Sequence, residues 1–285
     1  MAIERLGIVG SGIMGSGIAE VAAKAGVTVV LRSRKQETAD AMVVSLDRSL
    51  DKQVSRGKLD EGEAKAIRGR VSATADLEAL ADCDLVLESV VEDLAVKKQL
   101  FAELDRIVKD GAIIATNTST LPVIELAVET GRPERVCGIH FFNPAPAMSL
   151  VEVIRTLVSS DETVAEAVAF ADACGKGPVV VEDRAGFIVN ALLFPYLNNA
   201  VRMLENRTAS RDDIDAAMKG GCNFPMGPLA LLDLVGLDTS VAILDALYTE
   251  FRDPNYAAVP LLRRMVVAGH LGRKSGQGFY DYTKK

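Results

Sequence analysis

The chain has 285 residues, which at about 150 residues per domain predicts roughly two domains and a core that needs no disulfide or metal cross-links. Hydrophobic residues make up 49% and charged residues 25%, which is typical of a globular protein and excludes a disordered or collagen-like chain. The net charge of −7 argues against a general nucleic-acid binder and against binding to anionic membranes.

The cysteines and the first residues predict a cytoplasmic location. Cys83, Cys137, Cys174 and Cys222 are too far apart for a CxxC pair or a local zinc motif, so we expect reduced thiols and no metal site. The first ten residues lead directly into a strand pattern without the features of a signal peptide. No segment has the roughly 18 apolar residues that cross a bilayer. We therefore expect a soluble protein of the cytoplasm.

Short apolar runs alternate with longer helical segments over the first two thirds of the chain. The pattern predicts strands at 6–9, 27–31, 85–90, 113–116, 136–140, 150–154 and 179–181, with helices at 15–25, 37–56, 60–68 and 94–109. This alternation indicates a mostly parallel sheet covered on both faces. From Phe187 onward nearly all the periodicity is helical. We predict a Rossmann-type, doubly wound, mostly parallel α/β domain over residues 1–184, followed by an all-helical domain over residues 185–285.

A glycine-rich loop follows the first predicted strand and opens the first helix. Its sequence, Gly10-Ser11-Gly12-Ile13-Met14-Gly15, matches the dinucleotide-binding pattern GxGxxG. In this pattern the first glycine permits a tight turn and the second lets the backbone approach the pyrophosphate. The third lets the helix pack on the strand, with the phosphates at the helix N-terminus. We predict that residues 10–15 bind a dinucleotide, and the alternative is a glycine-rich turn without a ligand.

The end of the second predicted strand favours NADP(H) over NAD(H). NAD-binding units usually carry Asp or Glu there, about 20 residues after the loop, to bind the adenosine ribose. This chain instead has Arg32-Ser33-Arg34-Lys35. A small hydroxyl group between cations accommodates a 2′-phosphate, which a carboxylate would repel. If these cations are only solvated, NAD(H) is the cofactor.

One of the two histidines of the chain, His140, stands at the end of a predicted strand. Ligands bind at the carboxyl ends of strands in open α/β sheets. Glu152 lies inside a later apolar strand pattern, where a carboxylate needs a partner. We predict that His140 is a general base oriented by Glu152, and the alternative is a structural histidine. His270, at a helix end, is given no catalytic role.

Seven motifs follow one another along the chain: Gly10–Gly15, Val91–Lys97, Asn117–Leu121, His140–Pro144, Leu150–Val153, Gly186–Asn190 and Pro225–Pro228. In this order they resemble the L-3-hydroxyacyl-CoA dehydrogenase family. The length is similar to that of the bacterial 3-hydroxybutyryl-CoA dehydrogenases within it.

The resemblance implies an oxidoreductase that interconverts a short (S)-3-hydroxyacyl-CoA and its 3-ketoacyl-CoA, such as acetoacetyl-CoA. His140 would take or return the 3-hydroxyl proton while hydride moves between C3 and the nicotinamide, and Glu152 would support the imidazolium. Ser119 and Asn190 would bind the reacting oxygen and the thioester region. Without the resemblance, these two residues would be interpreted as local polar groups.

The resemblance also implies the residues that bind the cofactor and the coenzyme A arm, and a homodimer through the C-terminal helical domain. Ser49, Lys52 and Arg56 lie three and four residues apart, on one helix face, and resemble a CoA-contacting helix; a solvated face is the alternative. The predicted cofactor-binding residues are Gly10, Gly12, Ile13, Met14, Gly15, Arg32, Ser33, Arg34, Glu92, Lys97, Asn117, Ser119 and Asn143.

Two other functions fit parts of the sequence. A dehydrogenase of the same architecture could act on a free hydroxy acid. A non-catalytic NADP(H)-binding protein is the other alternative, but such a protein has no need of His140 together with Glu152.

Overall fold

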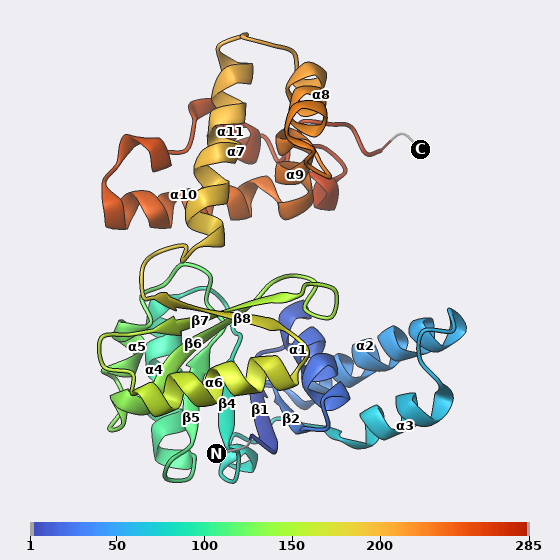
Figure 1. Ribbon diagram of the computed structural model, residues 1–285, viewed down its shortest axis with the longest axis vertical. Helices are drawn as coiled ribbons and strands as arrows, with labels where there is room; N and C mark the ends of the chain where they lie inside the picture. Colours follow the sequence, from blue (N-terminus) through green and yellow to red (C-terminus); the bar gives the residue numbers. More distant parts are fainter. Residues whose placement is uncertain (1–2, 284–285) are drawn as a thin grey trace. The chain divides into compact units, whose positions relative to one another are not determined.

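The computed structural model describes residues 3–283, and the chain divides into two compact units between Asp183 and Arg184. The first unit contains an eight-stranded sheet in the order β3-β2-β1-β4-β5-β6-β7-β8 (Figure 1). The strands are β1 Arg5–Val9, β2 Thr28–Arg32, β3 Val71–Thr74, β4 Leu85–Glu88, β5 Ile113–Thr116, β6 Val136–Phe141, β7 Leu150–Arg155 and β8 Gly177–Glu182. The first six strands are parallel, β7 is antiparallel to β6, and β8 is parallel to β7. The predicted doubly wound, mostly parallel sheet is therefore confirmed.

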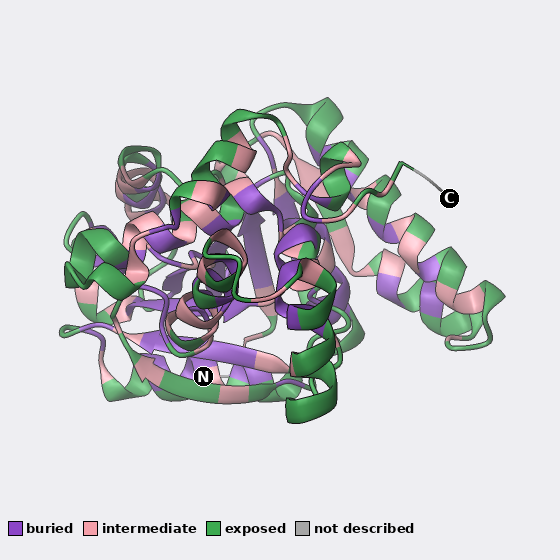
Figure 2. Cartoon of the chain, turned by 90° about the horizontal axis from the view of Figure 1, so that it is seen from above, coloured by how far each residue is buried: buried purple, intermediate pink, exposed green. Residues whose placement is uncertain are grey.

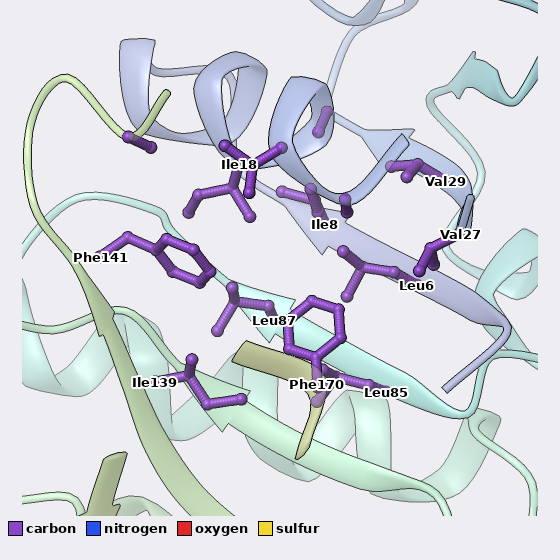
Figure 3. Close-up of a cluster of buried hydrophobic side chains, with 14 of the residues drawn as sticks. Leu6, Ile8, Ile18, Val27, Val29, Leu85, Leu87, Ile139, Phe141 and Phe170 are labelled. Atoms are coloured by element: carbon purple, nitrogen blue, oxygen red, sulfur yellow. The ribbon is translucent and has the colours of Figure 1, made fainter. Parts of the chain in front are cut away.

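Helices cover both faces of this sheet. They are α1 Ile13–Lys24, α2 Gln36–Ser55, α3 Glu61–Gly69, α4 Leu94–Ile107, α5 Ile124–Ala127 and α6 Asp161–Ala173. α1 and α6 share an apolar core with one face of the sheet, where Ile18 and Phe170 pack near Ile8, Leu87 and Phe141 (Figure 3). The inner strands of the sheet are largely buried, whereas the edge strand β8 is mostly exposed (Figure 2).

Strand alternation sends a row of polar side chains to the other face. The side chains of Leu87, Ala115, Ile139 and Val151 belong to the core beneath α1 and α6. Because successive residues of a strand point to opposite faces, the residue that follows each of them points to the side of α4. These four residues are Glu88, Thr116, His140 and Glu152, and all are buried. They lie near one edge of four neighbouring strands, β4 to β7.

Two details differ from the sequence predictions. β4 ends at Glu88 rather than at Val90, because the Glu88 carboxylate accepts the Val90 N–H at 2.6 Å and turns the chain. β3 was not predicted, because its four residues, Val-Ser-Ala-Thr, give only two apolar positions, too short an alternation to stand out, and none of them is fully buried.

The second unit is helical, as predicted. Its helices are α7 Val189–Glu205, α8 Arg211–Cys222, α9 Pro228–Val235, α10 Leu237–Phe251 and α11 Pro260–Val267. Leu197, Leu232, Leu244 and Leu262 are among its buried core residues.

All four cysteines of the chain are free thiols. Among residues 3–283 no helix combines the length and the apolar character needed to cross a membrane.

Candidate active site

The glycine loop follows β1 at the carboxyl edge of the sheet, and its three glycines meet different constraints. Gly10 has φ +138°, and a Cβ there would overlap the Ser89 carbonyl oxygen. A Cβ at Gly15 would lie 2.7 Å from Met42 Cε and 2.9 Å from the Gly10 oxygen. A Cβ at Gly12 would meet no protein atom within 4 Å. The chain itself therefore requires Gly10 and Gly15, whereas the open space above Gly12, the residue that caps α1, suits a ligand that approaches the backbone.

A cavity of about 320 Å³ opens beside this loop, between the ends of β1, β2 and β4. The order of the sheet reverses between β1 and β4, which is where ligands bind in doubly wound sheets. A smaller cavity of about 180 Å³ shares four residues with it and extends to Val96, Leu100 and Glu103 of α4. The larger cavity is lined by Val9, Gly10, Ser11, Gly12, Arg32, Ser33, Arg34, Ser89, Val90 and Val91. An extended dinucleotide fits the chemistry of this lining, with glycine amides at one end and two guanidinium groups at the other.

The end of β2 places Arg32, Ser33 and Arg34 together in the cavity wall. Ser33 is buried, and its Oγ lies 2.5 Å from Thr38 Oγ1, which itself donates to the Lys35 carbonyl at 2.8 Å. Arg32 Nε donates to the Ala75 carbonyl at 3.3 Å. Burial lowers the pKa of the Arg32 guanidinium, and the positive charge of Arg34 adds to this effect, which Glu103 and Asp76 partly offset. Two guanidinium groups that repel one another favour an anion between them.

His140 and Glu152 stand directly opposite each other on β6 and β7. The distance from His140 Nδ1 to Glu152 Oε2 is 2.8 Å, and both residues are buried, with Glu152 at 0% exposure. His140 Nε2 lies 3.0 Å from Ser119 Oγ. A neutral imidazole that donates Nδ1–H to Glu152 presents Nε2 as its acceptor. The antiparallel register of β6 and β7 thus lets Glu152 orient the His140 ring, which leaves Nε2 as the nitrogen that can act as a base.

A second polar network meets the first at Ser119. The backbone N–H of Ser119 donates to Glu92 Oε1 at 3.1 Å, and Thr118 Oγ1 also binds this oxygen. Glu92 Oε2 lies 3.2 Å from Lys97 Nζ. Lys97 is 1% exposed and forms two further contacts with Glu88. The sequence analysis did not single out Glu88, although a lone carboxylate at the end of an apolar strand is the same signal that identified Glu152.

The two predicted asparagines of the first unit lie at the ends of neighbouring strands. Asn117 Oδ1 accepts the Phe141 N–H at 2.8 Å, which links the ends of β5 and β6. Asn143 is exposed in the loop after β6, and its peptide bond with Pro144 is cis. The buried Lys176 Nζ holds this loop by donating to the carbonyls of Ala145 and Met148, both at 2.7 Å.

The residues predicted for the coenzyme A arm divide into two kinds. Lys52 and Arg56 are exposed at the end of α2. Ser49 instead turns toward α1, where its Oγ donates to Glu20 Oε2 at 2.6 Å.

Asn190 lies buried in the first turn of α7, in the second unit. Among residues 3–283 no three His, Cys, Asp or Glu side chains come together as a metal site.

Comparison with known proteins gives full-length similarity. Residues 5–184 match the family model "3-hydroxyacyl-CoA dehydrogenase, NAD binding domain", and residues 186–282 match "3-hydroxyacyl-CoA dehydrogenase, C-terminal domain". A 3-hydroxybutyryl-CoA dehydrogenase of Mycobacterium tuberculosis is 50% identical over 287 residues, covering 99% of each chain. The crystal structure of M. tuberculosis FadB2 has a TM-score of 0.97 at 49% identity and covers 99% of this chain and 100% of its own. That of (S)-3-hydroxybutyryl-CoA dehydrogenase PaaH1 from Ralstonia eutropha has a TM-score of 0.96 at 42% identity, with the same coverage.

The chain combines three features: a Rossmann sheet with a glycine loop, a helical unit that follows it, and a His–Glu pair. Together these features define an oxidoreductase that uses a nicotinamide dinucleotide. The chain belongs to the 3-hydroxyacyl-CoA dehydrogenase family. The resemblance stated from the sequence motifs is therefore confirmed, as is the prediction of an enzyme.

Proposed function

We propose that this chain interconverts (S)-3-hydroxybutyryl-CoA and acetoacetyl-CoA by hydride transfer. The observation that carries the proposal is the buried His140–Glu152 pair, with Nε2 directed at a second polar oxygen, Ser119 Oγ. The substrate class is supported by relatives named 3-hydroxybutyryl-CoA dehydrogenase that align over nearly the whole chain, including one from Clostridioides difficile that is 47% identical over 280 residues. The free hydroxy acid dehydrogenase and the non-catalytic binder are the alternatives that the experiment below separates.

His140 acts in this proposal as the general acid and base. In oxidation, Nε2 takes the proton of the substrate 3-hydroxyl; in reduction, the imidazolium returns a proton to the 3-keto oxygen. Glu152 holds the ring by its Nδ1–H and stabilises the positive charge that forms, because its carboxylate is buried and at 2.8 Å. Ser119 and Asn190 bind the reacting oxygen and the thioester region.

When bound, the nicotinamide accepts or supplies the hydride at C3. Residues 10–15 bind the pyrophosphate at the start of α1. Arg32, Ser33 and Arg34 bind the adenosine ribose and its 2′-phosphate, which makes NADP(H) the favoured cofactor and NAD(H) the alternative. Because cellular NADPH is mostly kept reduced, the favoured direction is reduction of acetoacetyl-CoA. Glu92, Lys97, Asn117 and Asn143 complete the proposed cofactor site.

The proposal extends to the remaining predicted features. Lys52 and Arg56, together with Ser49, bind the coenzyme A arm along α2. The second unit forms a homodimer, and the enzyme works in the cytoplasm. The division of roles between a dinucleotide-binding domain and a helical substrate and dimerisation domain is part of the same proposal.

The test is an assay of the purified full chain with acetoacetyl-CoA or free acetoacetate, each with NADPH and with NADH. We expect turnover of acetoacetyl-CoA, with the higher kcat/KM for NADPH. His140→Gln should lower kcat by about 10²–10⁴-fold while the affinity for the cofactor stays close to that of the unchanged protein. Turnover of acetoacetate alone would support the free hydroxy acid alternative, and cofactor binding without turnover would support the non-catalytic one. Unchanged turnover in His140→Gln would remove His140 as the base.

A further inference from the structure

A fully buried ion pair lies beside the proposed base. Lys97 Nζ is 2.7 Å and 2.9 Å from the two carboxylate oxygens of Glu88, and the two residues are 1% and 0% exposed. Removing two charges from water costs free energy that their attraction does not reliably return. Stability alone is therefore a poor explanation for this pair, and its surroundings indicate another.

Glu88 joins three elements at the carboxyl edge of the sheet. Besides Lys97 of α4, its carboxylate accepts the Val90 N–H at 2.6 Å and the Thr116 hydroxyl of β5 at 2.7 Å. Thr116 Oγ1 in turn accepts the Thr118 N–H at 3.1 Å. Hydrogen bonds of this kind fix side chains more rigidly when every member of the network is satisfied.

Lys97 links the Glu88 network to Glu92. Its Nζ lies 3.2 Å from Glu92 Oε2, and Glu92 is 40% exposed, so this side chain has little packing of its own. The other Glu92 oxygen accepts the Ser119 N–H at 3.1 Å and binds the hydroxyls of Thr118 and Thr120. Ser119 Oγ then lies 3.0 Å from His140 Nε2. The chain of contacts from Glu88 to His140 is continuous.

We propose that Glu88 is a positioning residue: by holding Lys97 against Glu92, it fixes Ser119 relative to Nε2 of His140. Its effect on turnover depends on the function proposed above, whereas its effect on the contact between Ser119 and His140 does not. A displacement of about 1 Å at a reacting group can lower turnover by about a hundredfold, so a buried residue three contacts from Ser119 can control the rate.

The variants separate positioning from folding. Glu88→Gln keeps the size of the side chain but leaves Lys97 without its main counter-charge. The double variant Glu88→Gln with Lys97→Met removes both charges, and such replacements of buried ion pairs often leave stability unchanged or raise it. Asp84→Asn is the matched control, because Asp84 precedes the same strand at its other end and forms an ion pair with Lys109 at 2.6 Å.

The first measurement is the ¹⁵N chemical shift of His140 Nε2 in the cofactor-free protein at a fixed alkaline pH. The chain has two histidines, so His270 is an internal reference. Ser119→Ala gives the signal that results when the Ser119 hydroxyl is lost. We expect Glu88→Gln and the double variant to shift the His140 signal in the same direction as Ser119→Ala, and Asp84→Asn to leave it in place.

The second measurement is steady-state kinetics with acetoacetyl-CoA. In both Glu88 variants we expect kcat to fall about tenfold to hundredfold. In Glu88→Gln, which keeps Lys97 of the proposed cofactor site, the KM for the cofactor should change much less. An unchanged His140 signal, or a double variant that regains full kcat, would overturn the proposal. If Glu88→Gln does not fold, the double variant decides. If the unchanged protein shows no turnover of acetoacetyl-CoA, the proposed function fails, and the shift of His140 still tests the positioning role.

Discussion

At the scale of single residues, Gly10 and Gly12 of the glycine loop have different roles: the fold requires Gly10, whereas Gly12 leaves space for the cofactor. Gly10→Ala places a Cβ against the Ser89 carbonyl oxygen at φ +138°, and should destabilise the fold by about 1–3 kcal/mol. Gly12→Ala meets no protein atom, so its melting temperature should stay near that of the unchanged protein. Its KM for the cofactor should nevertheless rise, because the methyl group occupies the space proposed for the pyrophosphate.

Thermal unfolding and cofactor titration of the two variants check this prediction. Equal stability losses would show that Gly12 has a structural role. A Gly12→Ala variant that binds the cofactor normally would place the pyrophosphate elsewhere.

Cofactor preference is the second prediction at this scale. Ser33→Asp puts a carboxylate where it can accept the ribose hydroxyls of NADH and repel a 2′-phosphate. A hydrogen bond to a charged group contributes about 1.5–3 kcal/mol, so the ratio of kcat/KM for NADPH to that for NADH should fall about tenfold to hundredfold. The control is Lys35→Gln, at an exposed neighbour outside the cavity lining, which should change this ratio little. A starting preference for NADH would show that Arg32 and Arg34 do not bind a phosphate.

At the scale of elements, the pairing of β6 with β7 determines the geometry of the proposed base. Glu152→Gln keeps the hydrogen-bonding shape but removes the charge that stabilises an imidazolium, so kcat should fall by about a hundredfold or more. Glu166→Gln is a suitable control: Glu166 is also a buried carboxylate, paired with Arg135 at 2.7 Å, but it lies on α6 on the other side of the sheet. It should lower the melting temperature while turnover stays close to normal. Equal kinetic effects of the two variants would contradict the role of Glu152.

The same pair of strands shows how far the sequence alone could lead. The scarcity of histidine and the apolar surroundings of Glu152 sufficed to predict the pair, because a buried carboxylate needs a partner. The antiparallel register that joins them was not predictable, since both strands read as apolar runs without direction. Glu88 and Lys97 were missed as a pair for a similar reason: Lys97 belongs to a helix whose buried face becomes apparent only when α4 packs on the sheet.

At the scale of the whole molecule, stability should depend on pH through carboxylates such as Glu20. Burial raises the pKa of Glu20, but hydrogen bonds from Lys24, Ser49 and Gln53 outweigh it, so the net pKa lies below the usual 4.5. A group with a depressed pKa stabilises the fold above its unfolded pKa and loses that contribution as pH falls through its folded value. Glu20→Gln should therefore be less stable at neutral pH and show a weaker loss of melting temperature below about pH 4.5. An identical pH profile would contradict this account.

The assembly of the molecule is the last prediction. α7 exposes Leu192 at 71% and Met203 at 43%, three turns apart on one face of the helix, and such exposed apolar side chains are typical of interaction surfaces. If the second unit forms the proposed homodimer, sedimentation should give twice the chain mass of 30.4 kDa. Leu192→Lys should then shift the equilibrium toward the monomer, because burying an unpaired charge in an interface is costly. Leu157→Lys, at a 94% exposed leucine of the first unit, should leave the dimer intact. A monomer at every concentration, or a dimer lost only in Leu157→Lys, would place the interface outside α7.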